Sequence, residues 1–363
     1  MKTYKTLFVL LSLITISLLF AEESKITPYP AKYWEALGNK LTQCTLCPRR
    51  CIINPAQRGV CGVRENKDGK LFTMVYGVPC AVNIDPIEKK PLFHFLPGST
   101  AFSIATAGCN LKCKFCQNWD ISQSLPEHTL NIPMQPDEIV KSAKENGCLS
   151  LAFTYSEPTI FYEYMFDIVQ LAHKAGIKNT MHSSGYINPE PLKALCKYLD
   201  AANIDLKGFT EEYYQEMCLG SLTPVLQSLK ILKKEGVWLE ITNLIIPTKN
   251  DDSASIRKMC EWIRDSLGAD VPLHFSRFWP MYKLKDLPPT PITTLERACK
   301  IAKKAGLKYV YIGNIPGNAS ENTYCPSCRR IVIKRKGYYV MENDIMVNGK
   351  CKFCGKKIAG VWK

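Results

Sequence analysis

The sequence predicts an α/β protein whose core is a partial (open) βα barrel, with one cysteine-rich segment before it and another after it. Short apolar runs typical of strands alternate with helical patterns at intervals of roughly 25–35 residues. No glycine-rich phosphate loop follows the first strand, which disfavours a doubly wound nucleotide-binding sheet. The polar motifs fall where strands end, which is where such barrels place their chemistry.

The predicted core spans residues 98–318 and contains seven strands. We expect these strands at 102–107, 149–155, 178–182, 201–206, 237–246, 271–275 and 309–312. The two clearest helices between them run from 159 to 175 and from 294 to 305. Both carry apolar residues at helical spacing, and a glycine, Gly176 or Gly306, ends each.

Two smaller segments flank this core. Residues 22–97 are rich in turn residues and predict a loop-rich cap, whereas residues 319–363 predict a ribbon-like tail. Within the tail, 331–346 alternates polar and apolar residues as a hairpin does.

Composition excludes some classes of protein and leaves others open. Apolar residues make up 46% of the 363, so the chain can bury a large core. The net charge of +14 comes without a dense basic block, and we interpret it as a lysine-rich surface and predict no nucleic-acid partner. Eleven of the 17 cysteines form three tight clusters, which does not suit an extracellular disulfide scaffold. The scattered cysteines are interpreted as small core residues. They are Cys80, Cys148, Cys196, Cys218, Cys260 and Cys299.

The central cysteine cluster follows the first predicted core strand. The loop 108–116 reads Gly-Cys-Asn-Leu-Lys-Cys-Lys-Phe-Cys, which places Cys109, Cys113 and Cys116 within a few residues of one another. Three thiolates can hold three irons of a [4Fe-4S] cluster and leave the fourth iron open. A zinc site needs four ligands and no fourth is close in sequence, so zinc is the weaker interpretation.

The spacing Cys-x3-Cys-x2-Cys, with an aromatic residue before the last cysteine, resembles the signature of the radical SAM superfamily. This resemblance implies that S-adenosylmethionine (SAM) binds the open iron and that a low-potential electron donor starts its cleavage. The resulting 5′-deoxyadenosyl radical abstracts hydrogen from a substrate. The absence of a recognisable catalytic triad is expected for such an enzyme, because the cofactor carries the difficult chemistry.

The ends of the next three strands carry further motifs of this superfamily. Residues 154–158 resemble the Gly-Gly-Glu-Pro motif that binds the methionine of SAM, with Tyr155 and Ser156 in place of the glycines and Glu157 kept. Helix capping is the alternative role for Glu157. The stretch at 182–186, with Ser183 and Ser184, resembles a ribose-facing stretch of glycyl-radical activating enzymes. Asp205-Leu206-Lys207 matches the Asp-Leu-Lys of those enzymes, which contacts cofactor or substrate, and a structural ion pair is the alternative.

The closest resemblance is to the radical SAM proteins of the AmmeMemoRadiSam system. It is carried by Cys-Gln-Asn-Trp at 116–119, by the run at 85–92 and by His-Phe-Ser-Arg-Phe at 274–278. Two substrates remain open: a protein or peptide, by analogy with pyruvate formate-lyase and other glycyl-radical activating enzymes, or a small molecule within that system. A non-catalytic iron–sulfur electron-transfer protein is the third hypothesis.

The outer cysteine clusters have four members each and could close a metal site. In the tail we expect zinc, with an iron–sulfur cluster as the competitor, on Cys325, Cys328, Cys351 and Cys354. In the cap, zinc and an auxiliary iron–sulfur cluster are equally compatible with the spacing of Cys44, Cys47, Cys51 and Cys61.

The first residues predict a targeting segment. Lys2 and Lys5 precede an apolar run at 7–20, and acidic residues follow Ala21. This layout is typical of a signal peptide and short for a membrane-spanning helix. We expect residues 1–21 to export the protein or to anchor it to a membrane. A cytoplasmic location is the alternative, because SAM and low-potential reductants are cytosolic.

Overall fold

The computed structural model describes residues 26–315 and 317–363, so the predicted leader at 1–21 lies outside the described residues. Its centre is an eight-stranded sheet with the order β14-β13-β12-β11-β10-β9-β8-β7. Strands β8 to β14 are parallel, and β7 pairs antiparallel with β8. The sheet ends at β7 and β14 and therefore does not close. The predicted α/β fold with a mostly parallel sheet is confirmed.

The strands of this sheet lie close to the predicted ranges. They are β7 (Ala81–Pro86), β8 (Thr100–Ala105), β9 (Ser150–Phe153), β10 (Lys178–Ser183), β11 (Ala201–Asp205), β12 (Trp238–Ile245), β13 (Leu273–Arg277) and β14 (Val310–Gly313). The parallel strands are buried on both faces, which explains why they are apolar runs in the sequence. Strand β7 falls in the range 22–97 that was expected to form the cap.

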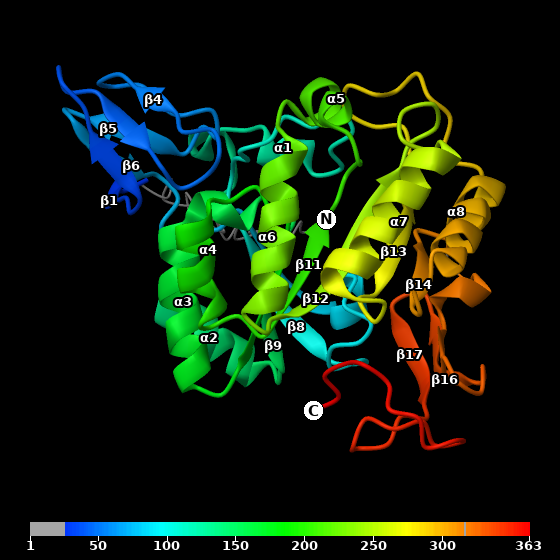
Figure 1. Cartoon of the computed structure of the whole chain (residues 1–363). Coiled ribbons are helices and arrows are strands. Elements are labelled where there is room, and N and C mark those ends of the chain that lie inside the picture. Colours follow the sequence, from blue (N-terminus) through cyan, green and yellow to red (C-terminus); the bar gives the residue numbers. More distant parts are fainter. Residues whose placement is uncertain (1–25, 316) are drawn as a thin grey trace, which may run out of the picture.

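One main helix joins each pair of successive parallel strands, and Figure 1 shows these helices covering one face of the sheet. They are α2 (Pro136–Glu145), α3 (Tyr162–Lys174), α4 (Pro189–Cys196), α6 (Leu222–Lys234), α7 (Ser253–Leu267) and α8 (Ile292–Lys304). Shorter helices are η1 (Ile87–Lys89), α1 (Trp119–Ser122), η2 (Pro126–His128), η3 (Pro158–Phe161), α5 (Glu211–Tyr213), η4 (Tyr214–Cys218) and η5 (Ala319–Glu321). The predicted helix at 159–175 is η3 followed by α3.

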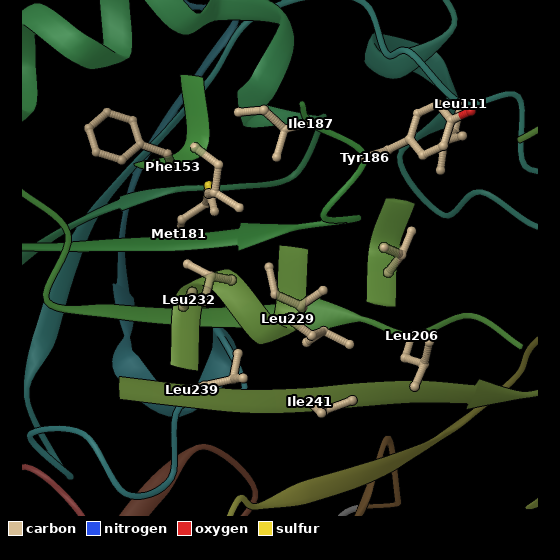
Figure 2. Close-up of a cluster of buried hydrophobic side chains, with 14 of the residues drawn as sticks. Leu111, Phe153, Met181, Tyr186, Ile187, Leu206, Leu229, Leu232, Leu239 and Ile241 are labelled. Atoms are coloured by element: carbon tan, nitrogen blue, oxygen red, sulfur yellow. The ribbon is translucent and has the colours of Figure 1, made fainter. Parts of the chain in front are cut away.

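Apolar residues at helical spacing attach these helices to the sheet. In α6, Val225, Leu229 and Leu232 are buried and face the strands. Figure 2 shows Leu229 and Leu232 against Leu239 and Ile241 of β12, within the main hydrophobic core. Among the scattered cysteines, Cys148, Cys196, Cys218, Cys260 and Cys299 are buried, as expected of core residues, whereas Cys80 is half-buried.

The cap consists of two small antiparallel sheets. One has the order β1-β6-β5, and the other the order β2-β3-β4. Their strands are β1 (Tyr29–Pro30), β2 (Trp34–Ala36), β3 (Thr42–Cys44), β4 (Ile52–Ile53), β5 (Arg64–Lys67) and β6 (Lys70–Thr73). The cap lies at the α3 side of the sheet in Figure 1.

The carboxyl-terminal tail forms a three-stranded antiparallel sheet from β15 (Thr323–Tyr324), β16 (Ile331–Lys336) and β17 (Tyr339–Asn343). Strands β16 and β17 form the predicted hairpin. The tail packs near β14, at the far end of the sheet from the cap (Figure 1). Within the described ranges, no helix combines the length and apolar character needed to cross a membrane.

Candidate active site

The loop that carries Cys109, Cys113 and Cys116, here called the central cysteines, begins just after β8. Gly108 introduces it with a φ of +95°, and a Cβ there would lie 2.6 Å from the carbonyl oxygen of Cys61. Glycine is therefore required at this position, both for its backbone conformation and for the close approach of the cap. Cys113 is buried, and the other two central cysteines are half-buried.

Backbone hydrogen bonds fix this loop against the π-helical turn η4. The amide of Lys112 donates to Cys218 O, and that of Lys114 donates to Met217 O, both at 2.9 Å. The Cys218 thiol also lies beside Cys113; its hydrogen bond and burial raise the pKa of Cys113. Because a metal ligand must be a thiolate, bound iron would have to supply the compensating positive charge.

Glu157 follows β9 and forms a buried hub of hydrogen bonds. Its Oε1 accepts from the amide and hydroxyl of Thr159 at 3.0 and 2.8 Å and from Ser183 Oγ at 2.6 Å. Its Oε2 accepts from Ser184 N at 2.9 Å and from Ser184 Oγ at 2.5 Å. The bond from Thr159 N caps η3. All five donors are neutral groups. A buried carboxylate is normally paired with a cation, and among the described residues Glu157 has none.

Tyr155 stands where the resembled motif has its first glycine, and it keeps a glycine-like backbone with a φ of +63°. Side chains from the run at 85–92 hold it there. The Tyr155 hydroxyl donates to Asp85, and Lys90 Nζ lies 4.3 Å from the centre of its ring. Burial lowers the pKa of Lys90 to about 8, although its 2.6 Å bond to Asp85 acts in the opposite direction. Ser156 Oγ is buried beside them and has no hydrogen-bond partner.

Asp205 and Lys207 form an ion pair at the end of β11. Lys207 Nζ lies 2.9 Å from Asp205 Oδ2, and His182 Nε2 lies 3.1 Å from Oδ1. Burial of Asp205 opposes its ionisation, but Lys207 and His182 outweigh this and hold its pKa below the usual range. The expected alternative, a structural ion pair, is therefore present, and both side chains also face the cavity described next.

One cavity brings the central cysteines and the predicted SAM residues together. Its walls enclose about 1720 Å³, part of it open to solvent. The predicted site residues that line it are Cys109, Cys113, Cys116, Ser156, Glu157, Ser183, Ser184, Asp205 and Lys207. The donor set fits the expected groups: three thiols on one cavity for iron, and, for a polar cationic ligand, the unpartnered hydroxyl of Ser156 and the Glu157 carboxylate, which has only neutral partners among the described residues.

Other residues of this cavity were not identified from the sequence. Asn314 directly follows β14, so the strand-end rule could have found it, whereas Thr242 lies within β12 and not at its end. Tyr338, at the turn of the β16–β17 hairpin, carries no such signal because it reaches the cavity only through folding of the tail.

The four tail cysteines, here called the ribbon cysteines, converge on one point. Their sulfur atoms all lie within 4.8 Å of one another. The pairs Cys325–Cys354 and Cys328–Cys351 are 3.6 and 3.8 Å apart. A metal or a second cluster can therefore be held there. The amino-terminal cysteines, Cys44, Cys47, Cys51 and Cys61, line a separate, small hollow.

Comparison with known proteins gives concordant results. The model of the radical SAM superfamily matches residues 103–262. An uncharacterized protein of Methanocaldococcus jannaschii is 48% identical over 90% of this chain and 98% of its own length. A pyruvate formate-lyase-activating enzyme of Listeria monocytogenes is 25% identical over 45% of this chain and 69% of its own length. A domain of a pyruvate-formate lyase-activating enzyme from Bacteroides vulgatus aligns with a TM-score of 0.40 and 18% identity, over 46% of this chain and 99% of that domain.

Proposed function

The chain belongs to the radical SAM superfamily, and we propose that the central cysteines hold its [4Fe-4S] cluster while Glu157, Ser156 and the 182–207 motifs position SAM. The protein is thus an oxidoreductase-type enzyme that uses a [4Fe-4S] cluster and SAM. When both are bound, they would supply radical chemistry: one low-potential electron would break the C–S bond of SAM to give methionine and a 5′-deoxyadenosyl radical, which would take hydrogen from the substrate. The observation that carries this proposal is the single cavity that the central cysteines share with Glu157 and Asp205.

The residues of the chain orient and shield this chemistry. Glu157 offers a buried negative charge to the ammonium of SAM, and the hydroxyls around it can rotate their protons away to free its lone pairs. Lys207, held by Asp205, lies on the same wall as the central cysteines. Cys113 is buried and Cys109 and Cys116 are half-buried, so the chain shields this part of the cavity partly from water, which limits side reactions of a radical.

For the substrate, we propose a protein or peptide segment of the glycyl-radical type. The cavity is partly open to solvent, and it extends from the central cysteines to Tyr338 of the tail hairpin. An open route of this length suits a polypeptide loop that enters beside bound SAM.

A small molecule of the AmmeMemoRadiSam system is the second candidate. It is favoured by the run at 85–92, which is shared with that system and contributes Lys90 to the cavity wall. A buried lysine is suited to binding an anionic group.

The test is deuterium transfer. Anaerobically reconstituted enzyme is incubated with SAM, a reductant and an extract of deuterated cells that has been separated into macromolecules and dialysable molecules. We expect deuterium in 5′-deoxyadenosine with the macromolecular fraction, and its loss after protease treatment. Transfer from the dialysable fraction alone would favour the small molecule. A Cys109→Ala, Cys113→Ala and Cys116→Ala variant that still cleaves SAM would refute the cluster assignment.

A further inference from the structure

The amino-terminal cysteines are brought together around a hollow that is distinct from the SAM cavity. Cys44 ends β3, and its amide donates to Cys51 O at 2.9 Å. Between them the chain makes a tight turn closed by the 3.1 Å bond from Arg50 N to Cys47 O. Cys61 comes from the loop before β5, and all four cysteines line one hollow.

The spacing of the sulfur atoms separates the cysteine clusters into two size classes. Tetrahedral zinc with Zn–S bonds of about 2.3 Å needs sulfur atoms roughly 3.8 Å apart. Each sulfur of a [4Fe-4S] site binds a different corner of the cube, so these sulfur atoms lie roughly 6 Å apart. Among the described residues, only the ribbon cysteines meet the 4.8 Å limit for a single ion. No three of the amino-terminal cysteines, and not the three central cysteines, meet this limit, so neither set is spaced for a single ion as the ribbon cysteines are.

Two buried polar residues line the same hollow, and each has one side-chain atom without a hydrogen-bond partner. The Arg64 side chain is 2% exposed; its guanidinium donates to Cys44 Sγ at 3.5 Å, and its Nε has no partner. Asn110, 1% exposed, has an orphan Oδ1. A guanidinium N–H beside the thiols suits the negative charge that four thiolates give an iron–sulfur cluster.

The hollow adjoins the loop of the central cysteines. Asn110 lies in that loop, between Cys109 and Cys113, and it is also part of the hollow's wall. Arg49, another wall residue, donates from Nε to Asn110 O at 2.8 Å. The opposite side is near solvent, because Ile52 and Val60, the neighbours of Cys51 and Cys61, are 61% and 44% exposed.

We propose that the amino-terminal cysteines bind a second [4Fe-4S] cluster that relays electrons to the cluster on the central cysteines. The electron source is a low-potential one-electron protein of the ferredoxin or flavodoxin class. Each transfer oxidises that donor by one electron; the second cluster gains this electron and then passes it on, and no bond or proton moves. The identity of the metal centre stands on the geometry alone, whereas the relay rests on the proposed function.

Metal content tests the first part. Anaerobically reconstituted wild-type protein should contain about eight irons per chain, and the triple alanine variant of the central cysteines should keep about four. The iron that remains in this variant should give an electron paramagnetic resonance signal that SAM does not change. A Cys47→Ser, Cys51→Ser variant should lose about four irons but keep the SAM-responsive signal, which also shows that it has folded. The matched control, Cys80→Ser, alters a cysteine outside all three clusters and should keep every metal. About four irons and two zincs in the wild type would overturn the assignment, whatever the variants do.

Choice of reductant tests the relay. The quantity measured is the rate of 5′-deoxyadenosine formation with reduced flavodoxin divided by the rate with dithionite. This ratio should be at least tenfold lower in the Cys47→Ser, Cys51→Ser variant than in the wild type. Equal ratios in the variant and the wild type would overturn the relay but not the cluster. If the wild type forms no 5′-deoxyadenosine with either reductant, the proposed function fails, and the iron content still decides the cluster.

Discussion

Replacing Glu157 by Gln separates a SAM ligand from a helix cap, because the two roles predict different combinations of effects. The carboxylate accepts backbone N–H bonds from Thr159 on one oxygen and from Ser184 on the other. In either orientation of a glutamine amide, its NH2 group faces one of these two backbone N–H groups. Two donors then face each other, and a backbone N–H cannot act as an acceptor. The variant therefore loses one buried hydrogen bond to a charged acceptor and leaves one amide unpaired.

The magnitude follows from this geometry. A hydrogen bond to a charged group contributes about 1.5–3 kcal/mol, so the free energy of unfolding should fall by that amount. If Glu157 also faces the ammonium of SAM, the lost charge should weaken SAM binding about ten- to a hundredfold, since about 1.4 kcal/mol corresponds to a factor of ten. The central cysteines are untouched, so the iron content should remain.

The assay measures three quantities on one anaerobic preparation: iron content, the midpoint of thermal unfolding, and SAM affinity from the change in the cluster signal. Thr159→Val is the matched control, because it removes a hydroxyl bond to Glu157 but keeps the charge. Glu157→Gln with lowered stability and unchanged SAM affinity would refute the ligand role and leave the cap alone.

Four further predictions concern other parts of the chain. Tyr338→Ala should lower substrate-coupled deuterium transfer more than substrate-free SAM cleavage; equal losses would remove Tyr338 from the substrate route. The ribbon cysteines should hold one zinc per chain, and Cys354→Ser should lose it and make the tail sensitive to limited proteolysis, whereas iron in its place would contradict the zinc assignment. Burial lowers the pKa of His94 to about 4, so as the pH falls this histidine is protonated in the unfolded chain before it is protonated in the folded chain. The free energy of unfolding should therefore fall by about 3 kcal/mol between pH 6.5 and pH 4. The His94→Gln variant should show a flatter pH dependence of stability. Residues 1–21 should direct the protein to a membrane or across it. Cell fractionation with mass spectrometry of the amino terminus tests this, and a cytosolic protein that begins at Met1 would contradict it.

The parallel strands could be predicted because burial on both faces makes them continuous apolar runs. Strand β7 could not, because it is an edge strand with Asn83 and Ile84 exposed, and its sequence resembles that of the preceding loops. The strand ends then indicated the site, since parallel strands bring their carboxyl ends to one edge. Glu157 and Asp205 lie at such ends, and it was the resemblance to radical SAM motifs that identified them.

The contacts that hold these side chains could not be predicted from the sequence. Cys218 was correctly interpreted as a buried core cysteine, yet nothing in its spacing indicates that its thiol lies beside Cys113. Ser183 and Ser184 were expected to face a ribose; both line the cavity, and both also donate hydrogen bonds to Glu157 that the sequence did not indicate. Such pairings join separate strand ends, and periodicity within one strand carries no information about them.

The positions of the two cysteine-rich segments suggest how electrons and substrate use different sides of the enzyme. The cap closes one side of the central loop: the Cys61 carbonyl is so near Gly108 that it leaves no room for a Cβ, and Arg49 binds Asn110 O. The tail lies at the opposite end of the sheet in Figure 1 and reaches the cavity through Tyr338. A substrate that enters beside the tail leaves the cap free for a protein donor. Under the proposed relay, separate sides would allow substrate and electron donor to be bound at once, so the electron would arrive with the substrate in place and unproductive cleavage of SAM would be limited.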